Sequence, residues 1–369
     1  NTRDFDSLIP GSSPGRVASR RPAFPSWRIV LILDTPEAQF AIAAVREAAL
    51  LARRIQREMV AGALIKNDRS PVTVADFAVQ ALIARRLAEH LPGSVLIGEE
   101  QSDALRLEEG VATLDQVTSF VRTAISDATP EEVCGLIDRG SGEPPRTFWT
   151  LDPIDGTKGF LRREQYAIAL ALIVNGRVEL GVLGCPALDD EFMWEDYEPQ
   201  PGGPGSLIVA AAGKGTWRQP LDLGDEAYNP SWRGLTVSAR SQPSTARILR
   251  SVEKAHTNVD EVGQLAAKLG VTAPPLAMDS QAKYALLAAG AGDILLRLLS
   301  PSRPDYREKI WDQAAGSIIV TEALGRVTDL DGKPLDFSEG RTLATNRGIL
   351  ATNEYLYDAV LRGLRDIDA

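Results

Sequence analysis

From Thr35 onward, apolar residues recur at helical spacing. They are Phe40, Val45, Ala49, Leu50, Ile55 and Met59. This spacing places one apolar stripe along a helix, so we predict a long amphipathic helix. Asp68-Arg69-Ser70-Pro71 breaks the pattern, and Thr73 has the chemistry of an N-cap for a second helix. Its apolar positions are Phe77, Leu82, Ile83 and Leu87, and Pro92-Gly93 ends it.

The middle of the chain alternates strand patterns with polar segments. We predict strands at Val95–Ile97, which ends at Gly98-Glu99-Glu100, and at Phe148–Leu151. Residues 101–146 between them are polar and acidic, and we interpret them as an insertion or a flap over a site, with residues 111–125 in a helix. An antiparallel hairpin joins residues 166–174 and 177–183 through Asn175-Gly176. Further strands are expected at residues 192–194, 207–212 and 235–239.

The last third alternates short helices and strands. We predict helices near residues 242–254, 260–269, 281–289 and 311–324, and strands near residues 294–298 and 325–328. The expected organisation is a loosely ordered tail over residues 1–34, an N-terminal α+β half over residues 35–233 and a C-terminal α/β half over residues 234–369.

Composition narrows the classes of partner. The net charge of −10 and the lack of a long basic run argue against a nucleic-acid polymer or an anionic membrane as partner. The longest apolar stretch, Ala167–Val174, is far shorter than the ~20 residues of a membrane helix. With two cysteines and two histidines in 369 residues, a bound metal should have oxygen ligands and be a hard cation. Cys134 and Cys185 are either structural thiols or redox-sensitive ones.

One turn carries the candidate chemistry: Asp152-Pro153-Ile154-Asp155-Gly156-Thr157. Pro153 restricts the backbone and Gly156 permits conformations closed to other residues. Both carboxylates and the carbonyl of Ile154 can therefore meet at one magnesium ion, and the amides of Gly156 and Thr157 can bind a phosphate oxygen. Because turns favour Asp, Pro and Gly, an ordinary turn is the alternative.

Three more carboxylates stand at the ends of predicted elements: Asp76, Glu99 and Asp312. Asp312 lies in Trp311-Asp312-Gln313-Ala314-Ala315-Gly316. This segment and the Asp-Pro-x-Asp-Gly-Thr turn resemble the two signatures of the inositol monophosphatase superfamily. The segments 66–73, 158–162, 164–167, 251–256, 279–284 and 308–312 are similar to its 3′(2′),5′-bisphosphate nucleotidase branch. The resemblance runs from about Thr35 to the C-terminus, and residues 300–304 form a slightly longer link than is usual there.

The resemblance implies an α/β fold, a layered α/β/α/β/α sandwich, and a lithium-sensitive phosphatase that uses two or three Mg²⁺ ions. It implies metal ligation by the side chains of Glu99, Asp152, Asp155 and Asp312 and by the carbonyl of Ile154. Asp76 is implied as a ligand or as the base that, with Thr157, deprotonates the attacking water in an in-line displacement.

The implied substrate is 3′-phosphoadenosine 5′-phosphate, a metabolite of sulfur assimilation, with its 5′-phosphosulfate analogue as a possible second one. His256, Ser280, Lys283 and Arg297 are the implied nucleotide contacts. Each has a plain structural alternative: a helix-end residue, an N-cap, a solvated helix face and a strand-end charge.

Two other functions stay open. An inositol phosphate phosphatase would share every metal ligand, although we interpret the 101–146 segment and the Lys283/Arg297 pair as favouring a larger substrate. A catalytically silent binding protein would keep the fold without turnover. We expect a monomer or homodimer in the cytoplasm, or in an organelle if the N-terminal residues are a processed leader.

Overall fold

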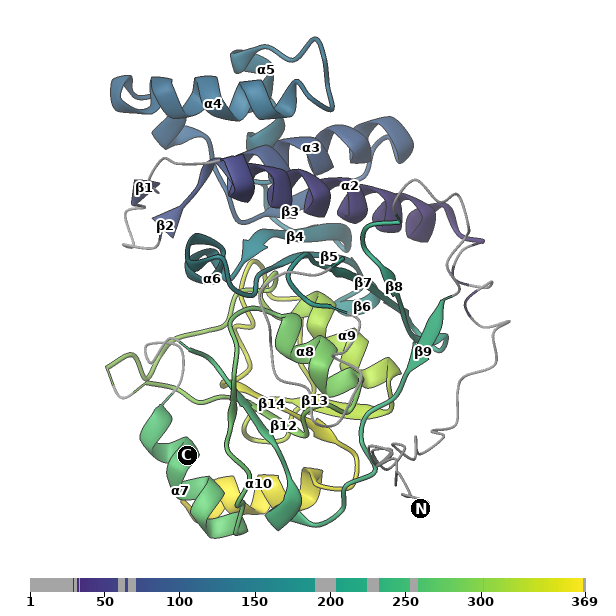
Figure 1. The fold of residues 1–369 in the computed structure, drawn as a ribbon, viewed down its shortest axis with the longest axis vertical. Helices are drawn as coiled ribbons and strands as arrows, with labels where there is room; N and C mark the ends of the chain where they lie inside the picture. Colours follow the sequence, from purple (N-terminus) through teal and green to yellow (C-terminus); the bar gives the residue numbers. More distant parts are fainter. Residues whose placement is uncertain are drawn as a thin grey trace, which may run out of the picture.

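The computed structural model is a stack of alternating helical and sheet layers (Figure 1). From one end to the other, the layers are helices, a large sheet, helices, a smaller sheet and helices. The α/β sandwich predicted from the sequence is therefore confirmed. The residues that the structure describes are 29, 32, 34–58, 64–65, 71–189, 204–223, 232–252, 258–300 and 302–367.

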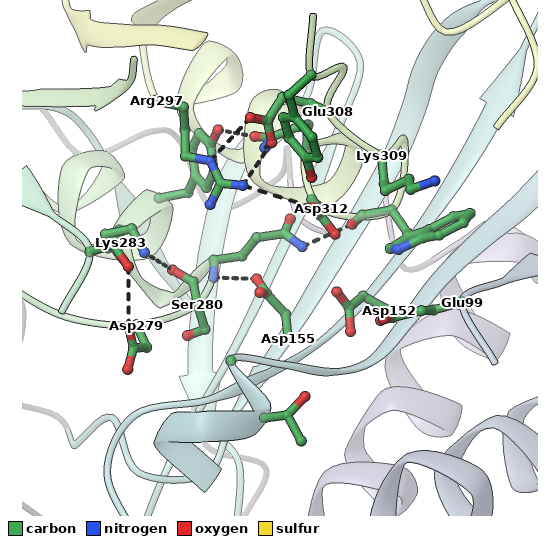
Figure 2. Close-up of a pocket in the computed structure, with 18 of the residues that line it drawn as sticks. Glu99, Asp152, Asp155, Asp279, Ser280, Lys283, Arg297, Glu308, Lys309 and Asp312 are labelled. Carbon is green, nitrogen blue, oxygen red and sulfur yellow. Dashed lines mark hydrogen bonds and ion pairs between the residues drawn. The ribbon is translucent and has the colours of Figure 1, made fainter. Parts of the chain in front are cut away.

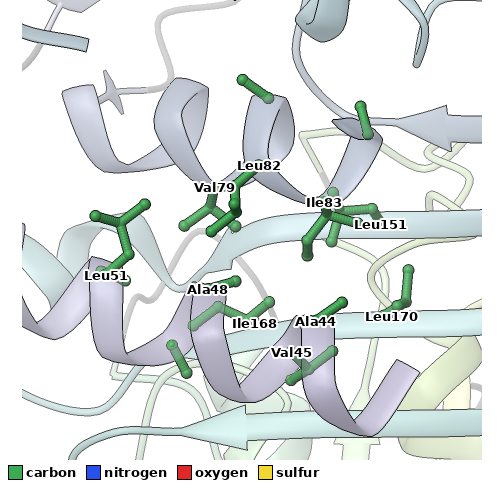
Figure 3. Close-up of a cluster of buried hydrophobic side chains, with 14 of the residues drawn as sticks. Ala44, Val45, Ala48, Leu51, Val79, Leu82, Ile83, Leu151, Ile168 and Leu170 are labelled. Atoms are coloured by element: carbon green, nitrogen blue, oxygen red, sulfur yellow. The ribbon is translucent and has the colours of Figure 1, made fainter. Parts of the chain in front are cut away.

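The first layer contains α2 (Pro36–Glu58) and α3 (Val74–His90), as the apolar spacing predicts. Thr73 caps α3, because its side chain accepts a hydrogen bond from Ala75 N while Asp76 accepts one from Thr73 N. Both helices pack their apolar faces on the large sheet. Figure 3 shows this contact, with residues such as Ala48 of α2, Leu82 of α3 and Ile168 of the sheet.

The described residues of the large sheet form seven strands in the order β3-β4-β5-β6-β7-β8-β9. β3 pairs with β4 in parallel, and every other pair is antiparallel. The strands are β3 (Leu96–Gly98), β4 (Thr147–Asp155), β5 (Ala167–Val174), β6 (Arg177–Cys185), β7 (Ser206–Ala211), β8 (Gly215–Pro220) and β9 (Arg233–Leu235). The predicted hairpin at Asn175-Gly176 joins β5 to β6. The predicted strand over residues 235–239 is present only at its first residue, β8 was not predicted, and residues 192–194 lie outside the described residues.

The segment over residues 101–146, predicted as an insertion or a flap over a site, packs mainly on the first layer, and its first residue, Gln101, lines a pocket. After the short turns η1 (Asp103–Arg106) and η2 (Glu108–Gly110), it forms α4 (Val111–Val121) and α5 (Pro130–Asp138), which pack on α3 away from the large sheet (Figure 1). Val117, Val121 and Ile137 join the core of the first layer. The helix predicted at 111–125 is present, but the apolar face of this segment is used for packing on α3.

The third layer holds α8 (Ala282–Ala288) and α9 (Ala314–Glu322), between the two sheets (Figure 1). The smaller sheet has five described strands in the order β11-β10-β12-β14-β13. They are β10 (Ile248–Arg250), β11 (Leu276–Ala277), β12 (Ile294–Arg297), β13 (Gly325–Thr328) and β14 (Ile349–Asn353). Helices α7 (Val259–Leu269) and α10 (Tyr357–Asp366) cover its far face.

The helix predicted over residues 242–254 is wrong. Its described residues form the turn η4 (Pro243–Thr245) and then β10. β10 pairs in parallel with β11 on one side and β12 on the other, and Ile248 and Leu249 are buried. A short apolar run fits a buried strand as well as a helix turn, so the neighbouring strands decide its conformation.

The chain also contains three smaller elements. The chain forms the strand pair β1 (Leu64–Ile65) and β2 (Pro71–Val72), and the short helix α6 (Thr157–Arg162). In the part of the chain that the structure describes, no helix has the length and apolar character needed to cross a membrane. The predicted tail over residues 1–34 lies almost entirely outside this part, and the boundary near Gly234 stays a prediction.

Candidate active site

A pocket of about 600 Å³ lies where β3 and β4 end against the third layer. Four of the predicted metal ligands line it: Glu99, Asp152, Asp155 and Asp312. Figure 2 shows Asp152 and Asp155 on one side and Asp312 across from them, with Glu99 beside Asp152. Carboxylates from three separate parts of the chain therefore meet in one cavity.

The Asp-Pro-x-Asp turn interrupts the pairing of β4 with β5. Asp152 pairs with Ala169 and Asp155 with Ala167, so β4 contains one more residue than β5 between these pairs. Pro153 lies in this irregular stretch, where it has no N–H to contribute to a ladder. Gly156 then has φ 87°, a left-handed conformation that favours glycine. The turn is thus built into a strand end and aims its carboxylates at the pocket.

Asp152 is one of the buried carboxylates of the pocket. Its side chain is 3% exposed, and its Oδ1 has no hydrogen-bond partner among the described residues. Burial raises the pKa of Asp152 well above its usual range, and the charges of Glu99, Asp155, Asp312 and Asp76 raise it further. A buried carboxylate oxygen without a partner costs free energy unless a cation compensates it.

The donor set therefore suits a hard cation bound by oxygen atoms. Within the described ranges, however, no group of three or more His, Cys, Asp or Glu side chains is arranged to hold a metal ion. In the described part of the chain, the carboxylates therefore line one pocket without forming a preassembled group of three.

Asp155 is held by the third layer. Its Oδ2 accepts a hydrogen bond from Gln281 N at 2.5 Å. The side chain of Gln281 in turn donates to Trp311 O at 2.9 Å and accepts from Gly316 N at 2.9 Å. Burial raises the pKa of Asp155, while the charge of Lys283 opposes that increase. Gln281 thereby links the turn to the start of α9, next to Asp312.

Asp312 faces a network of paired polar groups. Arg297 donates to Glu308 Oε2 at 2.8 Å and lies 3.9 Å from Asp312 Oδ2. Gln313 also donates to Glu308 Oε2, at 2.8 Å, and accepts from Tyr284 Oη. Burial and neighbouring carboxylates raise the pKa of Asp312, whereas Arg297 lowers it. The guanidinium predicted to contact the nucleotide is thus already paired with Glu308 at the pocket wall.

Lys283 and Ser280 lie beside the turn. Lys283 Nζ donates to Met278 O at 3.0 Å and Ser280 O at 2.8 Å, and burial lowers the pKa of Lys283 to about 8. Ser280 has φ 70°, and its Oγ accepts from Ala282 N at 3.2 Å. A Cβ on Gly156 would lie 3.0 Å from Ser280 Cβ, so this close approach requires glycine. Ser280 therefore supports the start of α8 and also lines the pocket.

The other residues predicted for the site are Asp76, Ile154, Gly156, Thr157 and His256. Asp76 is 1% exposed and is not among the described residues that line the pocket; it accepts hydrogen bonds from Thr73 N and Thr73 Oγ1 at 2.7 and 2.6 Å. The carbonyl of Ile154 accepts from Thr157 Oγ1 at 3.2 Å. Gly156 and Thr157 line the pocket, whereas His256 lies outside the described residues.

Several pocket residues were not predicted. Asp279 accepts hydrogen bonds from Ser251 Oγ at 3.2 Å and from Arg162 of α6. Glu308 and Arg341 also line the cavity. Glu308 lies in the segment 308–312 together with Asp312, so its acidic side chain could have been predicted as part of the site from the sequence. Nothing in the sequence around Arg341 indicates where its side chain lies.

Comparison with known proteins agrees with this architecture. The model of the inositol monophosphatase family matches residues 34–368. A 3′(2′),5′-bisphosphate nucleotidase of Schizosaccharomyces pombe is 40% identical over 344 residues, covering 88% of this chain and 94% of that protein. A protein of the same name from Oryza sativa is 43% identical over 337 residues, covering 88% and 92%.

Solved structures show the same fold. The IMPase of Thermotoga maritima superposes with a TM-score of 0.61 at 21% identity, covering 90% of this chain and 98% of that one. CysQ from Bacteroides thetaiotaomicron, described as a bacterial member of the inositol monophosphatase family, has a TM-score of 0.56 at 22% identity, covering 86% and 97%. The layered sandwich and its acidic pocket thus define a protein of the inositol monophosphatase fold. The chain belongs to the inositol monophosphatase family.

Proposed function

We propose that this protein is a 3′(2′),5′-bisphosphate nucleotidase that removes the 3′-phosphate of 3′-phosphoadenosine 5′-phosphate, giving AMP and phosphate. The observation that carries this proposal is one pocket that combines carboxylates with cations. The carboxylates Asp152 and Asp155 and the cations Lys283 and Arg297 line the same cavity. A bisphosphate requires both kinds of group: carboxylates that hold metal at the phosphate that is removed, and cations that bind the phosphate that stays. Relatives named 3′(2′),5′-bisphosphate nucleotidase, which are 37–43% identical to this chain, support the same function.

A metal ion belongs to this proposal, since the family is generally metal-dependent. Glu99, Asp152, Asp155 and Asp312 would hold Mg²⁺ through side-chain oxygens, and Ile154 through its carbonyl. The partnerless Oδ1 of Asp152 supports this assignment. Bound magnesium ions, two or three in number, would neutralise the phosphate and lower the pKa of the attacking water.

The chain's own residues orient and deprotonate the nucleophile. Thr157 begins α6 at the pocket, with its hydroxyl 3.2 Å from the carbonyl of Ile154. Asp76 accepts hydrogen bonds from Thr73 N and Thr73 Oγ1 at the start of α3, and its proposed role as base runs through Thr157. We expect the amides of Gly156 and Thr157 to donate to a phosphate oxygen, and Ser280 and Lys283 to position the nucleotide.

Substrate preference tests this function most directly. With Mg²⁺ present, we expect kcat/KM for 3′-phosphoadenosine 5′-phosphate to exceed that for inositol 1-phosphate by at least about 100-fold. The reason is that each charge-assisted phosphate contact is worth about 1.5–3 kcal/mol, or roughly 10- to 100-fold, and two cations, Lys283 and Arg297, line the pocket. Phosphate release from both compounds, and from the 5′-phosphosulfate analogue, measures the preference. A preference for the inositol compound would refute the nucleotidase proposal, and no turnover of either would support a silent binding protein.

Lys283 gives a second test, with a defined pH dependence. Lys283→Met should raise KM for the bisphosphate nucleotide by about 10- to 100-fold, because it removes one charge-assisted contact. Since the pKa of Lys283 is about 8, its charge is present below that pH and is lost above it. KM of the wild type should therefore rise above pH 8, and the variant should not show this rise.

The matched control for this test is Lys268→Met. Lys268 forms an exposed ion pair with Asp366 at 3.0 Å, on the layer formed by α7 and α10. The control should keep both the wild-type KM and its pH profile. Equal KM values for Lys283→Met and the wild type would remove Lys283 from the nucleotide site.

A further inference from the structure

Arg341 belongs to a segment that pairs with the chain just before Asp312. Ile310 N donates to Arg341 O at 3.2 Å, and Leu343 N donates to Glu308 O at 2.9 Å. An isolated bridge between Lys309 and Thr342 completes this pairing. The backbone of residues 341–343 is therefore fixed to the strand-like stretch that leads directly into Trp311-Asp312.

The side chain of Arg341 reaches in the other direction, to the strand end that carries Glu99. Its Nη2 donates to Gly98 O at 2.5 Å. Its Nη1 donates to Gly140 O and Gly142 O, each at 3.0 Å. Gly98 N itself donates to Gly140 O at 2.9 Å, so these two backbone stretches are already joined. One guanidinium thus binds three carbonyls around the residue that precedes Glu99.

Gln80 of α3 holds the same turn from the opposite side. Its side chain donates to Glu100 O at 2.7 Å and accepts from Glu100 N at 3.0 Å. A Cβ on Gly98 would lie 2.4 Å from Gln80 Oε1, so there is no room for a side chain there. Glu99 therefore stands between two anchors, Gln80 from the first layer and Arg341 from the C-terminal part of the chain.

The surroundings of Arg341 are unusual for a cation. Among the described residues no carboxylate lies within ion-pair distance of Arg341; burial lowers its pKa, and the charge of Glu143 opposes that shift. Its guanidinium carbon lies 4.9 Å from the centre of the Trp311 ring, the neighbour of Asp312. A half-buried charge without a carboxylate partner is costly unless its hydrogen bonds compensate. Arginine suits this place because its planar fork binds several carbonyls and stacks on an aromatic ring at once.

We propose that Arg341 is a positioning residue that sets the separation of Glu99 and Asp312, and thereby the affinity of the site for its divalent cation. Arg341 connects the backbone before Asp312 with the backbone before Glu99. Both carboxylates line the pocket, Glu99 just after the end of β3 and Asp312 just before α9. The inference rests on the proposed metal-dependent function and adds a residue that acts through Glu99 and Asp312.

The test uses Mn²⁺ as a probe for the metal site. Binding is measured by the electron paramagnetic resonance signal of free Mn²⁺ during titration of the full chain, without substrate. Arg341→Lys keeps the charge but loses the fork, and we expect its affinity for Mn²⁺ to fall by about 10-fold, the scale seen when a residue behind a metal ligand is replaced. Arg341→Met, which also loses the charge, should show a larger decrease.

Kinetics separate positioning from a general loss of structure. For Arg341→Lys, a high Mg²⁺ concentration should restore kcat to within about 3-fold of wild type, because a positioning residue affects the metal affinity and takes no part in the reaction itself. KM for the nucleotide should stay unchanged. The control Arg347→Lys alters an exposed arginine of the same segment, paired with Asp331 at 3.1 Å, and should leave all values unchanged.

Thermal unfolding in EDTA reports the purely structural contribution of Arg341. Wild-type Mn²⁺ affinity in a folded Arg341→Lys protein would overturn the proposal, and so would a decrease explained entirely by the unfolded fraction. If the wild type itself bound no Mn²⁺, the proposed metal site would fail, and with it this role for Arg341. If the wild type bound Mn²⁺ and Arg341→Lys bound it equally well, only the role of Arg341 would be refuted, and the proposed function would stand.

Discussion

Replacing Asp152 with asparagine should lower kcat by about 10³-fold while the protein remains folded. Asp152 lies at the centre of the carboxylates, and its buried Oδ1 has no partner among the described residues. An amide has the same shape but no negative charge, so the variant keeps the packing and loses the main ligand of the proposed ion. Metal contributes several kcal/mol to stabilising transition-state charge, and 1.36 kcal/mol corresponds to tenfold in rate.

The same substitution should not destabilise the protein in EDTA. Glu99, Asp155, Asp312 and Asp76 all act to raise the pKa of Asp152, which means that its negative charge is disfavoured without a cation. We expect the thermal midpoint of Asp152→Asn in EDTA to equal or exceed that of the wild type. Asp331→Asn, at an exposed ion pair, is the control and should retain full activity. Near-normal turnover by Asp152→Asn would remove this residue from the catalytic site.

Removing divalent cations should abolish turnover completely, and adding Mg²⁺ should restore it. The pocket gathers six carboxylates, four of them the predicted metal ligands, and no histidine or cysteine among its described lining residues. Oxygen ligands of this kind select hard cations such as Mg²⁺. Activity after dialysis against EDTA, followed by titration with Mg²⁺, measures the requirement.

A thermal shift provides an independent measure of the same cation. Because a ligand that binds only the folded protein stabilises it by mass action, Mg²⁺ should raise the midpoint of the wild type. The increase should be absent in Asp152→Asn. Full phosphate release in the presence of excess EDTA would contradict a metal-dependent mechanism, regardless of the shift.

The sequence by itself determined the local elements and the chemistry of the turn. The apolar spacing of residues 36–58 and the Thr73 cap predict α2 and α3 because a helix needs only neighbours along the chain to show its periodicity. Asn175-Gly176 predicts the β5–β6 hairpin for the same reason, since the turn residues are adjacent to the strands they join. Pro153 and Gly156 likewise indicate an unusual backbone at the acidic turn.

Only the tertiary structure decided how distant segments use these elements. Residues 248–250 form a strand because β11 and β12 flank them, and residues 101–146 pack on α3 because their apolar face meets that helix. The pairing of Arg297 with Glu308 and the reach of Arg341 to Gly98 join residues 11 and 243 positions apart. Hydrogen bonds over such separations depend on where the layers place each strand end, so no local pattern can reveal them.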